Sequence, residues 1–346
     1  MQALAGVRIV ASGETLELQA TDMEMSVRLS IHGQVEDDGT VLLPARLVLD
    51  IVRALPEAVV TLEERADRQD VEITSGNAVF DVRTLRGEDF PRLPDSPGSG
   101  LRLAAGAFID TVARVARSAS RDDTRPVLTG ILVHASGNEL RMVATDSYRL
   151  SIKTTTLDAP VSESFEANVP ARALQEVSRI ASQTDTAEIA VARLENQVVF
   201  TLHSEGGATV VSSRLIDGQF PNYQQLLPES VEHELRVDRE ELASVVRRIS
   251  LLAQKNAPLR LAFSEGELRV SAQTPDIGEA QESLPVPFAG EPFAIGFNPE
   301  FLRDGLESVE SSELLLRLTS PLRPGLIESA DGSGFVYLVM PIRLGA

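Results

Sequence analysis

The stretch LRMVATDSYRLSI, Leu140–Ile152, reads as two strand-like segments joined at Thr-Asp-Ser, and it decides the fold because the chain repeats it. Related phrases are LELQATDMEMSV, which begins at Leu16, and LRVSAQTPDIGEA, which begins at Leu268. The interval between copies is that of a whole domain rather than the roughly 20–50 residues of a solenoid unit. The chain is therefore predicted to be a tandem triplication.

Other phrases recur at the same interval. VLLPARLVLDIVRAL (Val41–Leu55) matches ANVPARALQEVSRIA (Ala167–Ala181), and GFNPEFLRDGLESV (Gly296–Val309) is a weaker third copy. TLRGEDFPRLP (Thr84–Pro94) matches RLIDGQFPNYQQLLP (Arg214–Pro228). Connectors rich in Pro, Gly and Ser follow these last two phrases and mark boundaries. The predicted domains are residues 1–98, 99–228 and 229–346.

The second copy shows the plan of one domain. Apolar residues at helical spacing in FIDTVARVARSAS predict a helix, which three alternating segments follow, GILVHAS, ELRMVAT and YRLSIKT. A second helix begins after Pro170, and three further strand-like segments follow it. The predicted fold class is α+β, with each domain built from two halves that pair a helix with an antiparallel sheet.

The first copy is shorter than the second. ALAG at Ala3–Gly6 aligns with VLTG at Val127–Gly130, so the counterpart of Leu101–Arg125, a strand and an amphipathic helix, is missing. The first domain is expected to expose the apolar surface that this helix covers. Either the start codon lies too far downstream, which we favour, or the fold has been pared down.

Composition limits the class of function. The chain has 346 residues and no Cys, which excludes disulfides, thiolate zinc sites and a cysteine nucleophile, and a cytoplasmic protein is expected. It has no apolar run long enough to span a membrane, and a signal peptide is not expected. The four His residues lack metal-ligand spacing, and nucleotide-binding and nucleophile-elbow motifs are absent. No catalytic residue, metal or cofactor is predicted.

Charge is distributed unevenly along the predicted helices. The net charge of −19 argues against nucleic acid, yet Arg114, Arg117 and Arg121 lie on one side of a helix, opposite its apolar face. One such helix is explained by a solvated face, but four favour a basic surface that holds phosphates without reading bases. The chain has no Trp and only three Tyr for base stacking. The cations predicted to face DNA are Arg46, Arg53, Arg114, Arg117, Arg121, Arg172, Arg179, Arg248 and Lys255.

Several phrases resemble one known family. VATDSYRL, DGQFPNYQQLLP, GFNPEFL and the terminal YLVMPIRL are similar to the β sliding clamp of bacterial DNA polymerase III, and the resemblance runs from Ala3 to Leu344. It implies a head-to-tail homodimer that closes into a ring of six domains, with helices inside and sheets outside. Such a ring encircles double-stranded DNA, performs no chemistry, and tethers the polymerase III alpha subunit, the clamp loader and other clamp-motif proteins.

The resemblance also implies where partners bind. Their short peptides dock in a pocket between the second and third domains, and the matching residues are Arg125, Leu128, Thr145, Tyr148, Arg149, Leu150, Pro221, Gln225, Leu226, Asn298, Phe301, Leu322, Pro324, Met340, Pro341, Ile342, Arg343 and Leu344. At the dimer seam the resemblance points to Phe80 and Leu251. From the residues alone, Met340 and Leu344 are better explained as part of an ordinary buried last strand.

The chain departs from the family pattern near this pocket. Ser147-Tyr148 stands where the family usually has Gly-His, and Gln224-Gln225 where it usually has two Arg. These changes leave an alternative open, a divergent clamp-like paralogue that acts as an accessory or inhibitor-resistant binding protein. Asp22 and Asp146 follow Thr in the repeated Ala-Thr-Asp phrase, and we interpret them as turn residues that bond backbone amides rather than as catalytic acids.

Overall fold

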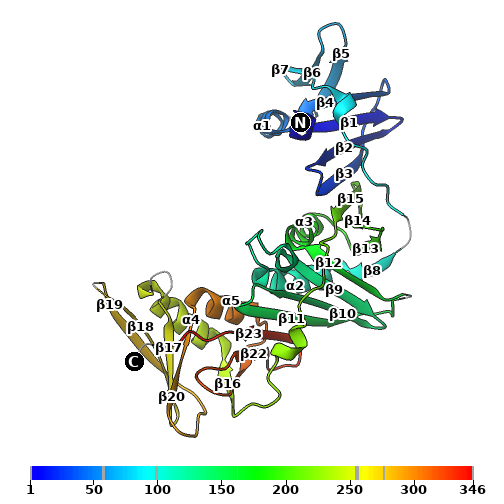
Figure 1. The fold of residues 1–346 in the computed structure, drawn as a ribbon. Coiled ribbons are helices and arrows are strands. Elements are labelled where there is room, and N and C mark those ends of the chain that lie inside the picture. Colours follow the sequence, from blue (N-terminus) through cyan, green and yellow to red (C-terminus); the bar gives the residue numbers. More distant parts are fainter. Residues whose placement is uncertain are drawn as a thin grey trace. The chain divides into compact units, whose positions relative to one another are not determined.

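The computed structural model describes residues 2–56, 59–97, 100–161, 163–253, 257–275 and 277–344 (Figure 1). The chain forms two compact units. One unit holds Met1–Ala105 and Arg179–Leu215, and the other holds Gly106–Ser178 and Ile216–Ala346. No helix in the described part is both long and apolar enough to cross a membrane.

A sheet of eight antiparallel strands dominates the first unit, in the order β4-β1-β2-β3-β15-β14-β13-β8 (Figure 1). The strand bounds are β1 Gly6–Ser12, β2 Thr15–Thr21, β3 Met25–His32, β4 Gly39–Pro44, β8 Leu101–Ala104, β13 Glu188–Arg193, β14 Gln197–Ser204 and β15 Gly207–Arg214. β3 pairs with β15, and the hydroxyl oxygens of Ser26 and Ser212 lie 2.6 Å apart where they meet. The sheet thus joins strands of the first and second sequence copies.

A smaller sheet and helix α1 complete the first copy. The sheet has the order β5-β6-β7, with bounds β5 Thr61–Arg65, β6 Asp70–Ser75 and β7 Ala78–Arg83, and α1 spans Ala45–Ala54. Ile51 on α1 is buried in a cluster with Leu43 and Val71. The apolar residues of α1 that stay 48% exposed are Leu47, Leu49 and Val52. The first copy thus exposes apolar surface on α1.

The second unit contains a corresponding eight-stranded sheet, in the order β12-β9-β10-β11-β23-β22-β21-β16 (Figure 1). The bounds are β9 Gly130–Ser136, β10 Glu139–Thr145, β11 Arg149–Thr156, β12 Phe165–Pro170, β16 His233–Asp238, β21 Glu313–Leu318, β22 Gly325–Ser329 and β23 Phe335–Val339. Arg149 pairs with Val339, and Val339 pairs with Gly325. This register places the beginnings of β11 and β22 beside the end of β23.

A four-stranded sheet and two helices form the remaining core of the second unit. The sheet has the order β19-β18-β17-β20, with bounds β17 Leu259–Ser264, β18 Glu267–Thr274, β19 Gly278–Pro285 and β20 Phe293–Phe297. Helices α4 (Arg239–Ile249) and α5 (Pro299–Ser308) pack against each other. Asp238 begins α4 by accepting a hydrogen bond from the Glu241 amide at 2.8 Å, as an N-cap residue does.

Two further helices belong to the second sequence copy. Helix α2 spans Ala105–Val115 and buries Phe108, Val112 and Val115, the apolar face that its spacing predicts. A 3-10 turn continues to Ser118, and the next residue is extended, so the helix ends before Arg121, contrary to the prediction. The end of the helix coincides with a bond of the buried Ser118 hydroxyl to that of Ser151, 2.7 Å away. Helix α3 spans Ala171–Ser182.

The element order repeats as predicted. The second and third copies each read strand, helix, three strands, strand, helix, three strands, and the first copy contains the last eight of these ten elements without their opening strand and helix. Each eight-stranded sheet combines strands of two neighbouring copies. The compact units therefore follow the sheets, whereas the sequence repeats run across them.

Close packing of α5 on β23 gives a test of this core. A Cβ at Gly305 would lie 2.5 Å from Cδ1 of the buried Tyr337 ring, so Gly305→Ala is expected to lower the free energy of unfolding by about 1–3 kcal/mol. At Gly106 on α2 a Cβ meets nothing within 4 Å. Gly106→Ala is the matched control, expected to be neutral or to stabilise by up to about 1 kcal/mol through helix propensity. Urea denaturation measures both, and equal effects would contradict the packing argument.

Candidate functional site

The turn between β10 and β11 is built by Thr145 and Asp146. One Asp146 carboxylate oxygen accepts hydrogen bonds from the amides of Tyr148 (2.9 Å) and Arg149 (3.0 Å), and the Thr145 hydroxyl donates to the Arg149 carbonyl at 2.7 Å. Ser147 adopts a left-handed conformation with φ 80°, which side chains other than Gly seldom adopt. The prediction that Asp146 is a turn residue is confirmed. Its bonds leave the Tyr148 side chain exposed at the sheet end.

Arg149 is the buried charge beside this turn. Its side chain is 8% exposed, and its guanidinium donates to the Asp146 carboxylate at 3.0 Å, to the Asp304 carboxylate, and to the Arg117 carbonyl at 2.5 Å. It also lies 4.4 Å from the centre of the Phe301 ring, a cation–π contact. Burial works against its charge, but the carboxylates of Asp304 and Asp146 outweigh burial and raise the pKa of Arg149 above its ordinary value.

The C-terminal tail connects this turn to β20. The Met340 amide donates to the Tyr148 carbonyl at 2.9 Å, and the Ile342 amide donates to the Gly296 carbonyl at 2.7 Å. Gly296 allows the close approach, because a Cβ there would lie 2.7 Å from the Ile342 carbonyl oxygen. The tail therefore leaves β23 at Val339 and is held on both sides by backbone hydrogen bonds.

Large apolar side chains stay exposed around the tail. Tyr148 is 59% exposed, Leu226 46%, Leu322 63% and Met340 39%. Tyr148 also stacks on Phe301, with ring centres 6.3 Å apart and planes at 26°. Exposed apolar side chains that gather on one surface are typical of an interaction site. We call the predicted pocket residues of the tail, this turn, α5 and the linker the candidate peptide site.

A buried cluster supports the candidate peptide site from below. Leu150, Leu326 and Leu338 belong to it, and the linker residues Phe220, Tyr223 and Leu227 pack against it. The sequence alone did not identify Leu326, Leu338 and these three linker residues as supports of the site. The clearest signal was the repeated Phe-Pro phrase, which places Phe220 in a connector where apolar residues need a partner surface.

The other predicted pocket residues have varied surroundings. Arg125 is exposed and donates to the Ser147 hydroxyl at 3.0 Å, and Leu128 is buried. The Asn298 side chain is engaged at the start of α5, where it accepts from the amides of Glu300 and Phe301 and so positions the Phe301 backbone. Pro221, Gln225 and Arg343 are exposed, whereas Pro324, Pro341, Ile342 and Leu344 are partly buried.

The junction of β3 and β15 provides an internal comparison. Its turn has the same plan: Asp22 accepts from the amides of Glu24 (3.0 Å) and Met25 (2.8 Å), and the Arg214 amide donates to the Glu24 carbonyl at 2.9 Å. These bonds confirm that Asp22, too, is a turn residue. Glu24 and Arg214 occupy the places of Tyr148 and Met340, and their side chains form an ion pair at 3.7 Å. The backbone plan is shared, but an ion pair stands here in place of Tyr148 and Met340, and the exposed apolar side chain of this turn is Met23.

Comparison with known proteins identifies the family. Family models of the DNA polymerase III beta subunit match along the chain, with the N-terminal domain at residues 1–94, the central domain at 102–222 and the C-terminal domain at 224–343. The chain belongs to this family, the beta sliding clamps. The predicted resemblance, the clamp fold and the non-catalytic processivity role are confirmed by this membership.

Individual clamps agree over nearly the whole length. The beta sliding clamp of Streptomyces coelicolor is 32% identical over 351 residues, which cover 99% of this chain and 92% of that protein. The solved sliding clamp of Bacillus subtilis superposes with a TM-score of 0.92 at 28% identity, covering 100% of this chain and 93% of that one. The clamp of Bartonella birtlesii, solved bound to griselimycin, gives a TM-score of 0.91 at 29% identity, covering 99% and 92%.

The cations predicted to face DNA differ in how exposed their side chains are. Arg46, Arg53, Arg121, Arg172, Arg179 and Arg248 belong to exposed positions, and Arg117 is 43% exposed. Arg248 pairs with Glu282 at 2.6 Å, which raises the pKa of its guanidinium. Arg121 lies in the loop after α2 rather than on the helix. Lys255 lies outside the described residues.

Arg114 has a different environment from the other cations. Its side chain is 12% exposed, and its guanidinium bonds Asp110 at 2.6 Å, Glu310 at 2.7 Å and the Ser308 carbonyl at 2.5 Å. These partners tie α2 to the end of α5. An arginine so enclosed has few donors left for phosphate, so we leave Arg114 out of the DNA surface proposed below.

The two residues predicted for the clamp dimer seam lie at sheet edges. Phe80 is on β7, the edge strand of its sheet, where it packs partly against the core, and its neighbour Val79 is 58% exposed. Leu251 is 84% exposed on the 3-10 turn Ser250–Leu252, which contacts the edge strand β19. Pro285 ends β19, an edge strand, where a sheet tolerates a residue that has no amide donor.

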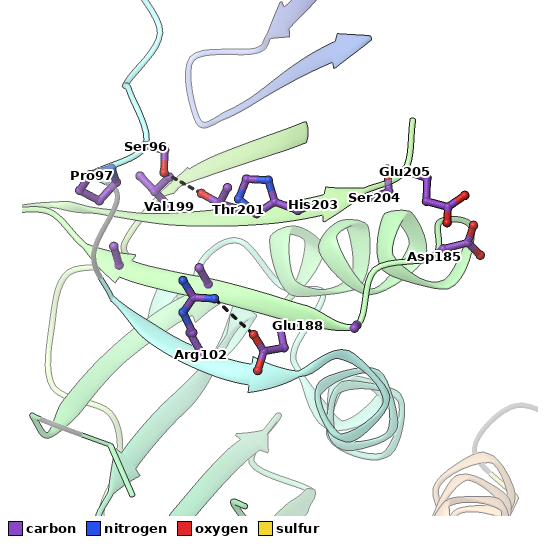
Figure 2. A pocket seen from close by; sticks show the side chains of 13 residues that line it. Ser96, Pro97, Arg102, Asp185, Glu188, Val199, Thr201, His203, Ser204 and Glu205 are labelled. Atoms are coloured by element: carbon purple, nitrogen blue, oxygen red, sulfur yellow. Dashed lines mark hydrogen bonds and ion pairs between the residues drawn. The ribbon is translucent and has the colours of Figure 1, made fainter. Parts of the chain in front are cut away.

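One cavity lies apart from all of these residues. It measures about 550 Å³, and Ala190, Ala192 and Val199 on β13 and β14 are among its lining residues. Around it the Ser96 and Thr201 hydroxyls bond at 2.8 Å, and Arg102 pairs with Glu188 at 3.3 Å (Figure 2). None of its lining residues is a predicted site residue, and these polar groups already satisfy one another.

Proposed function

We propose that two copies of the chain join head to tail into a ring that encircles duplex DNA, and that the candidate peptide site docks partner proteins on this ring. The proposal keeps the predicted domain limits, 1–98, 99–228 and 229–346. It includes as partners the DNA polymerase III alpha subunit, the clamp loader and other proteins with clamp-binding peptides.

The observation that carries the ring is a pair of complementary free edges. Within the chain, β3 of the first copy pairs with β15, the last strand of the second copy, and β11 of the second copy pairs with β23, the last strand of the third copy. In both cases the last of a copy's first three consecutive strands meets the last strand of the next copy. In the described part of the chain, β19 and β7 hold these two positions and each has a neighbour on one side only. Exposed edges invite pairing with another chain.

Two copies satisfy both edges at once. Pairing of β19 of one copy with β7 of the other is heterologous, and two such contacts related by a two-fold rotation close a ring. The exposed apolar residues Val79, Leu251 and Ile277 lie on or beside these edges, with exposures of 58%, 84% and 56%. Burial of their surface in a dimer supports the association.

The cations support contact with the DNA backbone rather than with bases. In the proposed ring Arg117, Arg121 and the exposed Arg side chains of α1, α3 and α4 face the duplex, while the net charge of −19 keeps DNA from the outer surface. Encirclement needs no tight binding, which fits an acidic protein. The alternative of a divergent accessory or inhibitor-resistant paralogue is not favoured, since relatives along the whole chain are sliding clamps.

Retention on circular DNA tests encirclement. The ring, once placed on a nicked circle, is expected to stay through gel filtration and to be lost when the circle is cut, because only topology holds it. Ordinary surface binding predicts equal retention on circular and linear DNA at low salt, and this result would exclude the ring.

A paired substitution tests the peptide site with griselimycin, the ligand seen on the Bartonella clamp. Asp146→Ala removes the acceptor of two turn amides and one contact of Arg149, so we expect a loss of about 1–3 kcal/mol in stability and about tenfold in griselimycin affinity. Asp22→Ala breaks the equivalent turn and should lower stability alone. Calorimetric titration distinguishes the two, and weakened binding in both variants would contradict the assignment.

A further inference from the structure

Asp304 links the candidate peptide site to a cation of the predicted DNA-facing set. It lies one helical turn after Phe301 on α5, and its side chain is only 15% exposed. One carboxylate oxygen accepts from the Arg149 guanidinium, and the other lies 3.5 Å from the Arg117 guanidinium. Asp304 was absent from the sequence prediction, although its spacing from Phe301 places the two on one face of the helix.

The contact with Asp304 fixes the plane of Arg149. A guanidinium donates in a rigid fork, so its carboxylate partners determine how it lies. Asp146 and Asp304 bind two of its nitrogens, the Arg117 carbonyl accepts from the third, and the flat face covers Phe301 at 4.4 Å. Phe301 in turn stacks with the exposed Tyr148. Asp304 therefore holds the stack of Arg149, Phe301 and Tyr148 at the candidate peptide site.

Arg117 competes for the same carboxylate. Its side chain is 43% exposed, and its guanidinium divides its contacts between Glu307, at 2.7 Å, and Asp304, at 3.5 Å. The longer contact is the weaker of the two, and an anion outside the protein can draw this cation away from it. If Arg117 moved away, Asp304 would keep its ion pair with Arg149 and no longer share its carboxylate with Arg117.

We propose that Asp304 is a positioning residue for the peptide site, and that it couples peptide affinity to the engagement of Arg117 by DNA phosphate. This inference rests on the proposed function. When phosphate draws Arg117 outward, Asp304 holds Arg149 more firmly and the site binds peptides more tightly. By linkage, a bound peptide favours the outward Arg117 by the same factor.

Griselimycin affinity in single and double variants tests the coupling. We expect Asp304→Asn to weaken binding about tenfold, and Arg117→Gln to tighten it a few-fold. In the Asp304→Asn background, Arg117→Gln is expected to change nothing, because the shared carboxylate is gone. Arg303→Gln is the matched control: Arg303 lies on the same helix beside Asp304, its ion pair is with Glu307 at 4.0 Å, and its loss removes the same charge.

Excess short duplex DNA at low salt supplies an independent readout. It is expected to tighten griselimycin binding to the unaltered chain and to leave the Arg117→Gln variant unresponsive. Melting temperatures show whether each variant is folded.

The outcomes separate the two proposals. Unchanged affinity in Asp304→Asn, or the same effect of Arg117→Gln in both backgrounds, overturns this inference alone. Failure of the unaltered chain to bind griselimycin overturns the proposed peptide site, and this inference with it.

Discussion

Changing Leu251 to aspartate is expected to convert the proposed dimer into single chains. Leu251 is 84% exposed beside β19, so the substitution leaves the fold of one chain unaltered. In the dimer this position is covered, and an unpaired carboxylate buried there costs several kcal/mol. A penalty of about 3 kcal/mol raises the dissociation constant more than a hundredfold, which a concentration series in sedimentation velocity measures directly.

Two companion variants make this test specific. Phe80→Asp on the opposing edge β7 should act in the same direction, with some loss of stability because Phe80 packs partly against the core. Leu62→Asp is the control, since Leu62 is 38% exposed on β5, the other edge of the same sheet. If Leu62→Asp separates the chains and Leu251→Asp does not, the seam has been placed on the wrong edges.

The repeat made the fold predictable from sequence. Residues such as Asp22 and Asp146 act locally: each bonds amides two and three residues ahead, so a three-letter phrase is enough to reveal the turn. The apolar face of α2 follows from helical spacing in the same way. Contacts between residues that are close in sequence can therefore be predicted from the local sequence.

Contacts between distant segments were not predictable in this way. The partners of Arg114 at Ser308 and Glu310 belong to another sequence copy, and no periodicity links them. Helical spacing therefore placed Arg114 with the solvent-facing cations, although the folded chain encloses it. Arg149 shows the same limit, because its tie to Asp304 depends on the pairing of β11 with β23 and on the position of α5.

The free edges of the sheets were also hidden from the sequence. Phe80 and Leu251 were singled out only by family resemblance. The equivalence of β7 with β15 and β23 emerges from strand order, which shows that the same pairing occurs twice within the chain and is left incomplete at β7 and β19. Dimerisation is thus inferred from strand topology rather than from composition.

Removal of the tail after Val339 is expected to abolish griselimycin binding, with a loss in affinity of at least about a hundredfold. The truncation eliminates Met340 and the two backbone bonds that join the tail to Tyr148 and Gly296. It spares β23, so the free energy of unfolding should fall by only about 1–3 kcal/mol, the worth of two hydrogen bonds. Calorimetric titration and urea denaturation measure the two effects separately.

The position of the cut decides whether this experiment is informative. A truncation that begins at Tyr337 would remove a fully buried ring whose hydroxyl donates to the Phe301 carbonyl at 2.7 Å, and burial raises the pKa of that hydroxyl so that it stays protonated. Such a chain is expected to lose the core of its last domain, and lost binding would then mean little. A cut after Leu344 keeps every tail contact described here and serves as the control. Full binding by the chain cut after Val339, with a normal melting temperature, would place the peptide site elsewhere on the molecule.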